Sequence, residues 1–256
     1  MTPQVWDAAD YAANARFVSD LGQVVLDLLA PTVGEQLLDL GCGDGALTAR
    51  LVEAGTSVVG VDLSPSLLAA ARSRGIDARL MDAERLTFDN EFDAVFSNAV
   101  PHWMPRIDAV LDGVFRALRP GGRFVGEFGG HGCVAAVTTA VRAVAARRGV
   151  QVTVPWYFPT AEEFRERLAA RGFGIVSVQL VPRPTILPSG MQAWLRTFAG
   201  PVFDQLPETE REPALTEAVE LLRGALCDTR GNWTADYTRL RFWAERPAED
   251  ESRAVR

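Results

Sequence analysis

The segment of this sequence best suited to bind a ligand is a glycine-rich loop, LLDLGCGDGAL, at residues 37–47. An apolar run precedes the glycines and a helical pattern follows them, as in a strand–loop–helix unit. Gly41, Gly43 and Gly45 let the backbone turn tightly and approach a ligand without a Cβ in the way. With Ala46, the first two glycines also satisfy the G-x-G-x-x-A pattern of dinucleotide-binding proteins. The glycines alone therefore leave the ligand open.

The acids around this loop favour a cationic ligand. Asp39 closes the strand two residues before Gly41, and Asp44 lies inside the loop. A pyrophosphate at the start of the following helix would meet two like charges. S-adenosylmethionine has no phosphate and carries an ammonium and a sulfonium, so the same acids favour its binding.

Further candidates for the cofactor site follow the next predicted strands. Asp62 ends the run VVGVD, where a carboxylate can accept hydrogen bonds from both ribose hydroxyls of either NAD or S-adenosylmethionine. Asp82 and Ala83 follow the third strand and are placed to meet the adenine; the alternative is a solvated turn aspartate. We also assign Leu63 and Asn98 to this site.

A histidine near the same strand ends is the candidate for acid–base chemistry. Methyl transfer from a sulfonium is an in-line displacement, for which the protein mainly supplies alignment and a dry pocket. A carboxylate acceptor needs no base, whereas a hydroxyl, an amine or a carbon acid usually does. His102, in the loop 98–105, is the candidate base; the alternative is a histidine that fixes this loop by hydrogen bonds or by stacking on Trp103. His131 is the second candidate.

Composition and charge exclude several classes of protein. The 33 acidic and 26 basic residues give a formal net charge of −7, which disfavours a nucleic-acid partner. All 26 basic residues are arginine, so lysine Schiff bases, pyridoxal phosphate attachment and the Walker phosphate loop are excluded. Three separated cysteines and two histidines disfavour a zinc site, and we expect no bound metal; Asp93 is expected to be buried in a strand.

No apolar stretch is long enough to span a bilayer, and residues 1–10 lack the basic and apolar regions of a signal peptide. The odd number of cysteines suits a reducing compartment. We therefore expect a cytoplasmic protein with no membrane partner; the sequence leaves the oligomeric state open.

The elements that position these residues alternate between short apolar strands and amphipathic helices. This alternation predicts an α/β fold, a Rossmann-like doubly wound and mostly parallel sheet with an antiparallel last strand. In that last strand, Leu240 and Phe242 share one face, and Arg239 and Arg241 share the other. The predicted strands are 36–40, 57–61, 78–81, 92–97, 123–128, 173–180 and 235–244, and the predicted helices are 46–53, 65–74, 107–118, 134–147 and 160–171.

About fifty residues between the last two strands are too many for a turn. Helical patterns at Trp194 and Phe198, and from Leu215 to Leu226, predict a helical cap over the carboxyl edge of the sheet, where ligands bind in open α/β folds. We assign residues 1–180 and 233–246 to the core, 181–232 to the cap insertion and 247–256 to a tail.

In order and in spacing, residues 30–180 resemble the class I methyltransferase family. The motifs that carry the resemblance are LDLGCGDG at 38–45, Asp62, Asp82 with Ala83, FDAVFSN at 92–98 and LRPGGRF at 118–124. The resemblance implies S-adenosylmethionine as cofactor, with Asp39 and the loop glycines around its methionine part, Asp62 at the ribose, and Asp82 and Ala83 at the adenine.

A narrower resemblance is to the trans-aconitate methyltransferase-like group, carried by SNAVPHW at 97–103, EFGGHG at 127–132 and NWTADYTRLRFWA at 232–244. It implies an inserted cap that closes over the site and an N-terminal helix, around residues 6–18, that covers the cofactor. The residues assigned to the acceptor pocket are Tyr11, Trp103, His131, Trp156 and Trp194.

The sequence thus predicts a methyltransferase that acts on a small-molecule acceptor. An NAD(P)-dependent oxidoreductase is the alternative from another class; the acids in the loop and the lack of a Tyr-x-x-x-Lys pair speak against it. A relative that binds the cofactor without transferring methyl is a third possibility, because its cofactor site would look the same.

Overall fold

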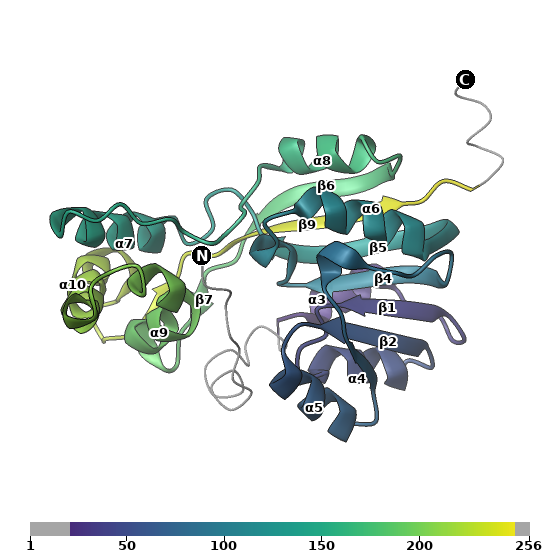
Figure 1. Cartoon of the computed structure of the whole chain (residues 1–256), viewed down its shortest axis with the longest axis horizontal. Helices are drawn as coiled ribbons and strands as arrows, with labels where there is room; N and C mark the ends of the chain where they lie inside the picture. Colours follow the sequence, from purple (N-terminus) through teal and green to yellow (C-terminus); the bar gives the residue numbers. More distant parts are fainter. Residues whose placement is uncertain (1–20, 249–256) are drawn as a thin grey trace.

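The chain folds around a seven-stranded sheet. The computed structural model describes residues 21–248, and Tyr11 lies outside the described residues. The strand order is β3 (Asp77–Leu80), β2 (Ser57–Asp62), β1 (Gln36–Leu40), β4 (Phe92–Asn98), β5 (Leu118–Gly129), β9 (Thr238–Glu245) and β6 (Gly174–Pro182) (Figure 1). The five strands from β3 to β5 pair in parallel, and β9 is antiparallel to both its neighbours. The predicted fold class is confirmed.

Helices cover both faces of this sheet. On one face, α3 (Gln23–Leu29) and α4 (Ala46–Glu53) bury apolar side chains against β1, β4 and β5, and α5 (Pro65–Ser73) packs beside them. On the other face, α6 (Ile107–Ala117) and α8 (Ala161–Ala169) form a larger apolar core with β4, β5 and β9. The predicted helix starts are confirmed: Ser64 caps α5 before a proline, and Thr160 with Glu163 forms the capping box of α8.

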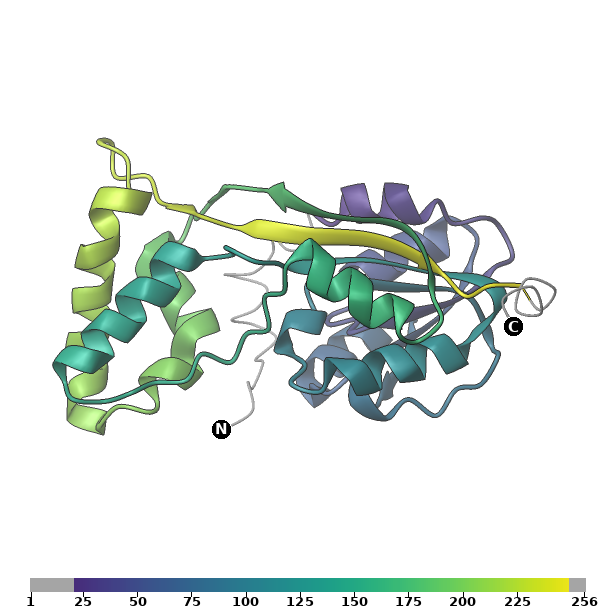
Figure 2. The same cartoon turned by 90° about the horizontal axis from the view of Figure 1, so that it is seen from above.

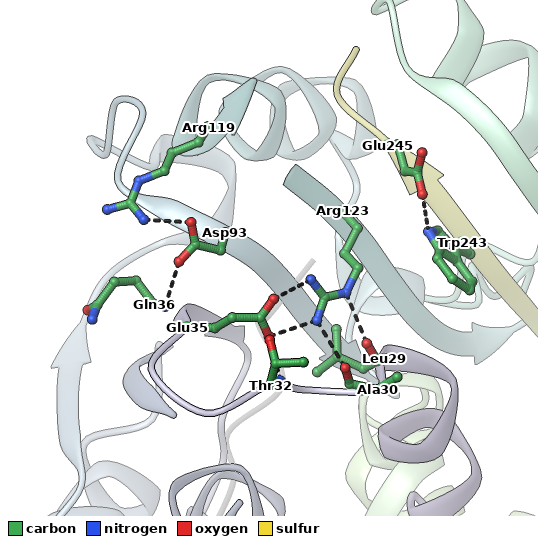
Figure 3. Close-up of polar contacts among 10 residues, drawn as sticks. All are labelled: Leu29, Ala30, Thr32, Glu35, Gln36, Asp93, Arg119, Arg123, Trp243 and Glu245. Atoms are coloured by element: carbon green, nitrogen blue, oxygen red, sulfur yellow. Dashed lines mark hydrogen bonds and ion pairs between the residues drawn. The ribbon is translucent and has the colours of Figure 1, made fainter. Parts of the chain in front are cut away.

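Polar contacts of Arg123 fix α3 to the sheet (Figure 3). The guanidinium, on β5, donates to the carbonyl oxygens of Leu29 and Ala30, which end α3, and forms two hydrogen bonds of 2.7 and 2.9 Å with the carboxylate of Glu35. Because Arg123 and Glu35 are each only 17% exposed, this ion pair is largely shielded from water.

The largest differences from the sequence-based prediction concern two strands and one side chain. The strand predicted over 123–128 extends back to Leu118, which pairs with Phe92, so the Pro-Gly-Gly turn lies within β5. The strand predicted over 235–244 is broken at residues 236–237, where the chain leaves the main sheet. Asp93 is half-buried rather than buried, because it accepts hydrogen bonds from the Gln36 backbone and Arg119 at the rim of the sheet (Figure 3).

A helical lobe extends beyond the sheet. It contains α9 (Gly190–Phe203) and α10 (Glu208–Leu226), and also α7 (Ala135–Arg147), which lies within the range 1–180 of the predicted core (Figures 1 and 2). The apolar face of α7 packs with α9 and α10 in one cluster, and Arg148 forms ion pairs with Glu210 and Glu217 of α10. The cap in this structure therefore has three helices from two separate parts of the chain.

Two of the chain segments that connect the lobe to the sheet are paired with each other. The segment after β6 and the segment before β9 run side by side and pair as β7 (Thr185–Ile186) and β8 (Thr234–Ala235) (Figure 2). The Arg183 N–H also donates to the Tyr237 carbonyl at 2.8 Å. The two long strands thus continue as a narrow ribbon, which positions the lobe beyond the carboxyl end of β5.

Candidate cofactor and acceptor sites

The glycine loop lies directly against the loop that follows β4. Gly41 adopts a φ of +78°, and a Cβ built on it would be 2.2 Å from a methyl carbon of Val100. The N–H groups of Gly41 and Cys42 both donate to the Val61 carbonyl, at 2.8 and 3.0 Å, which ties the loop to the end of β2. Only glycine meets both requirements at position 41, the left-handed backbone and the close approach.

Asp62, at the end of β2, is held by backbone donors. Its two carboxylate oxygens accept hydrogen bonds from the N–H of Gly43 at 3.1 Å and from the N–H of Ser64 at 2.8 Å. Burial raises the pKa of Asp62. Since each carboxylate oxygen has a second lone pair, the group can still accept hydrogen bonds from two ribose hydroxyls.

Asp39 lies deeper than its neighbours. It is 2% exposed and accepts a hydrogen bond of 2.6 Å from the Thr48 hydroxyl. Burial, with a smaller contribution from the charge of Asp62, raises the pKa of Asp39 to about 7. Asp44 instead forms an ion pair of 3.3 Å with Arg74 at the rim. The negative charge available to a cationic ligand therefore comes from Asp39 and Asp62, and the Asp44 charge is offset.

The remaining candidates for the cofactor site lie along the same edge of the sheet. Asp82 accepts a hydrogen bond from the Glu84 N–H at 2.9 Å and begins a short 3-10 helix, Ala83–Arg85, whose first residue is buried. Leu63 exposes 56% of its surface beside Asp62. Asn98 ends β4 and is half-buried. Their contacts with the cofactor stay a prediction.

His102 is buried next to the end of β5. Its Nδ1 atom accepts a hydrogen bond of 3.2 Å from the Gly129 N–H. Burial, and then the nearby charge of Arg239, lower its pKa well below the usual value, so the ring is neutral at pH 7. A neutral ring that accepts at Nδ1 carries its proton on Nε2. In this tautomer His102 has no free lone pair for a general base. The hydrogen bond to Gly129 ties the loop to β5, and the ring lies 5.3 Å from that of Trp103, tilted by 41° rather than stacked.

The aromatic residues assigned to the acceptor pocket meet where the sheet joins the lobe. Trp156 lies at the centre, with ring centroids 6.3 Å from both Trp103 and Trp194. Two further members were missed from the sequence: Phe158 stacks on Trp156, and Tyr237 accepts a hydrogen bond of 2.6 Å from Trp194. We call these five residues the aromatic cluster.

His131 does not join this cluster. Its side chain is exposed, and its backbone N–H donates to Pro159. Its assignment to the acceptor pocket has no support in the described contacts.

A buried group of charged residues was also missed. Glu127, on β5 and 1% exposed, binds Arg183 and Arg241 through its two carboxylate oxygens. The alternation of β9 places Arg239 and Arg241 on one face of the strand, but this pattern does not say whether that face is buried or solvated.

Two negative findings apply to residues 21–248. No three His, Cys, Asp or Glu side chains in that range converge in a way that could hold a metal ion. Within the same range, no helix combines the length and the apolar character that crossing a membrane requires.

Comparison with known proteins supports the sequence resemblance. The methyltransferase domain family matches residues 38–126, which include the glycine loop, Asp62 and Asp82. An uncharacterised methyltransferase of Schizosaccharomyces pombe is 35% identical over 261 residues, covering 96% of this chain and 100% of that protein. Trans-aconitate 2-methyltransferase of Methylobacterium nodulans is 36% identical over 126 residues, covering 46% of this chain and 47% of that protein.

Among solved structures, a protein from Bacillus halodurans described as a methyltransferase has a similar fold. The TM-score is 0.62 at 17% sequence identity, and the match covers 90% of this chain and 100% of that one. At this identity the likeness shows the fold alone.

Proposed function

Because this chain belongs to the class I S-adenosylmethionine-dependent methyltransferase family, we propose that it moves a methyl group from S-adenosylmethionine to a small-molecule acceptor. We place the acceptor at the aromatic cluster, between the carboxyl edge of the sheet and the helical lobe. The finding of a methyltransferase family does not favour the oxidoreductase alternative.

One observation carries this proposal: a single short loop contacts both sites. In the loop after β4, Val100 packs against Gly41 of the glycine loop, and Trp103, three residues later, packs against Trp156. His102, between them, is bound to the end of β5. A cofactor at the glycine loop and an acceptor at the aromatic cluster would therefore lie on two sides of one loop, as a direct transfer between them requires.

The residues present fit the proposed cofactor. Asp39 and Asp62 offer negative charge to an ammonium and a sulfonium and would repel a pyrophosphate. S-adenosylmethionine supplies an already activated methyl group with a neutral leaving group. The chain itself then has to bind, align and exclude water: Asp62 accepts the ribose hydroxyls, the aromatic cluster provides an apolar wall, and His102 holds the loop between them.

Calorimetric titration tests the cofactor part of this proposal. S-adenosylmethionine and S-adenosylhomocysteine are expected to bind with micromolar affinity, and NADH is not. Asp62→Ala should weaken the binding of S-adenosylhomocysteine by about 100-fold, because two hydrogen bonds to a charged group are lost. Asp77→Ala is the matched control, since this exposed aspartate on β3 forms its ion pair with Arg79 at the surface. Binding of NADH alone would overturn the proposal.

A mass-detected screen tests the transfer itself. The protein is incubated with S-adenosylmethionine and mixtures of small molecules, and a product heavier by one methylene is sought. If the protein binds the cofactor tightly but forms no such product with any acceptor class, the result would favour the hypothesis of a relative that binds the cofactor without transferring methyl.

A further inference from the structure

Strand β9 turns two arginines toward the α3 face of the sheet. Arg239, which is buried, and Arg241, which is half-buried, alternate with the apolar residues of the strand, and buried Tyr237 lies just before it. Arg239 is 3% exposed, as little as a core leucine. An arginine is rarely buried to this extent without an anionic partner, because its charge loses the hydration it has in water.

The nearest buried acid is already engaged by two other arginines. Glu127 accepts from Arg183 at 2.5 Å with one carboxylate oxygen, and from Arg241 at 2.7 and 2.9 Å with the other. Asp236, three residues before Arg239, accepts from the Ala136 N–H at the start of α7. Neither carboxylate contacts Arg239.

Arg239 therefore has no anionic partner among residues 21–248. Its guanidinium lies over the ring of Tyr237, 4.2 Å from the ring centre, and its Nε is buried without a hydrogen-bond partner. The Nε of Arg183 is buried and unpartnered as well. Arg183 and Arg241 thus share the Glu127 carboxylate, and the third guanidinium, that of Arg239, contacts no carboxylate of the described residues. The three arginines exceed the two nearby carboxylates, Glu127 and Asp236, which leaves an excess of positive charge.

This excess charge lies beside the aromatic cluster. Burial and the neighbouring charge of Arg239 lower the pKa of Arg183 to about 10. The Arg239 charge is also the second cause of the lowered pKa of His102. Tyr237, on which Arg239 stacks, belongs to the aromatic cluster through its hydrogen bond with Trp194. The unpaired guanidinium and the proposed acceptor pocket are therefore contiguous.

We propose that Arg239, assisted by Arg183, binds a small oxyanion, a carboxylate or a phosphate, on the methyl acceptor, while the apolar part of the acceptor packs on the aromatic cluster. A planar guanidinium matches two oxygens of such a group with paired hydrogen bonds. This inference rests on the proposed function, because it names the class of acceptor that the same pocket takes.

Thermal stability separates a ligand-binding arginine from a structural one. Arg239→Met keeps a long apolar side chain but removes a buried charge, so the melting temperature of the ligand-free protein should stay the same or rise. Arg241→Met, two residues along the same face, removes a partner of buried Glu127 and should lower the melting temperature by about 5 °C or more. A fall for Arg239→Met as large as that for Arg241→Met, or failure of the variant to fold, would overturn the proposal.

Binding of simple probes tests the recognised group directly. In the presence of S-adenosylhomocysteine, benzoate or phenyl phosphate should bind, as followed by ligand-observed NMR, and the neutral isostere benzamide should bind at least about tenfold more weakly. The comparison of benzoate with phenyl phosphate tells which oxyanion the site prefers. Arg239→Met should abolish the difference between benzoate and benzamide, whereas Arg196→Met, an exposed arginine of α9, should leave it unchanged.

The two proposals fail in different ways. Loss of S-adenosylhomocysteine binding in the wild-type protein would count against the proposed function. Two other results would overturn the oxyanion site and leave the methyltransferase function standing. In the first, the wild-type protein binds the cofactor normally but binds benzoate and benzamide with equal affinity. In the second, Arg239→Met prefers benzoate over benzamide as strongly as the wild type does.

Discussion

The Nδ1 atom of His102 accepts a hydrogen bond from the backbone N–H of Gly129 at 3.2 Å. This contact joins the loop after β4 to the end of β5, two elements that both border the proposed acceptor pocket. It also assigns the proton of the neutral ring to Nε2. We therefore expect His102 to fix the loop and to offer a donor, rather than to remove a proton from the acceptor.

The effect of substituting His102 should depend on whether the new side chain can still accept the hydrogen bond that Nδ1 accepts. His102→Asn keeps an acceptor for the Gly129 N–H, and we expect methyl transfer within about tenfold of the wild-type rate, since loss of a true base typically costs 10²–10⁴-fold. His102→Leu leaves that N–H buried and unpaired, and should lower the free energy of unfolding by about 1–3 kcal/mol. The pH profile of kcat should show no ionisation of His102 between pH 6 and 8.

A general base at this position would give a different pattern. His102→Asn and His102→Leu would then lose activity equally, while His102→Asn kept its melting temperature.

Cofactor binding should depend on the ionisation of Asp39. Because its pKa is about 7 in the ligand-free protein, and a cationic ligand favours the carboxylate, the affinity for S-adenosylmethionine should rise by up to about tenfold from pH 6 to pH 8. Calorimetry at constant ionic strength measures this change. Asp39→Asn should bind more weakly at pH 8 and show a flat profile; an unchanged slope in this variant would mean that another group titrates.

The ionisation of Asp39 should raise the affinity for the cofactor but lower the folding stability of the ligand-free protein. The folded-state pKa of Asp39 is raised above the ordinary value of 3.8, so between about pH 4 and pH 7 the folded protein keeps a proton that the unfolded chain releases. The contribution of Asp39 to the free energy of unfolding therefore falls as the pH rises through this window. Asp39→Asn should raise the melting temperature of the ligand-free protein at pH 8 relative to the wild type, and have little effect at pH 4.

Gly41 is predicted to be intolerant of even one methyl group. Gly41→Ala combines a strained positive φ, about 1–2 kcal/mol, with a clash against Val100 that costs about 1–3 kcal/mol more. Gly34→Ala is the matched control, because its φ is +89° but no atom lies within 4 Å of the added carbon. Denaturant unfolding should show the larger loss at position 41.

A second substitution identifies the cause of that loss. Val100→Ala removes the two methyl groups that the new Cβ would meet at 2.2 and 2.7 Å and keeps the Cβ at 2.9 Å. Compared with Val100→Ala alone, the double variant should therefore recover a large part of the clash energy. If the double variant is as destabilised as the sum of the two single variants, the close contact is not the cause.

Arg123 should contribute more to stability than its neighbour Arg119 on the same strand. Arg123→Met removes hydrogen bonds to Glu35 and to the last carbonyls of α3, and should lower the free energy of unfolding by about 2 kcal/mol. Arg119→Met removes a pair with Asp93 in which the arginine is 44% exposed, and should cost less than about 1 kcal/mol. If both substitutions lowered the free energy of unfolding equally, the larger contribution expected from the position of Arg123 between α3 and Glu35 would be contradicted (Figure 3).

The effect of Arg123 should also depend on pH. Its hydrogen bonds hold the pKa of Glu35 below 4.5, so this stabilisation is present above pH 4.5 and is lost as the pH falls through the lowered value. The difference between Arg123→Met and the wild type should therefore shrink in acid.

The sequence by itself determined the order of the elements and that the residues proposed for the cofactor site follow the ends of parallel strands. Strand and helix periods, the proline after Ser64 and the capping box at Thr160 are local signals, and local signals set where elements begin. The glycines and acids at strand ends were predictable because parallel strands place their carboxyl ends along one edge.

Only the tertiary structure decided which residues from distant parts of the chain meet. The sequence pattern of α7 predicted a helix with one apolar face. It could not predict what that face packs against, because an amphipathic face can pack on a sheet or on other helices. The alternation in β9 put Arg239 and Arg241 on one face, yet the burial of that face depends on what the rest of the chain lays over it. The pairing of Glu127 with Arg183 and Arg241 joins β5, β9 and the segment after β6. This long-range contact leaves Arg239 buried without an anionic partner among residues 21–248.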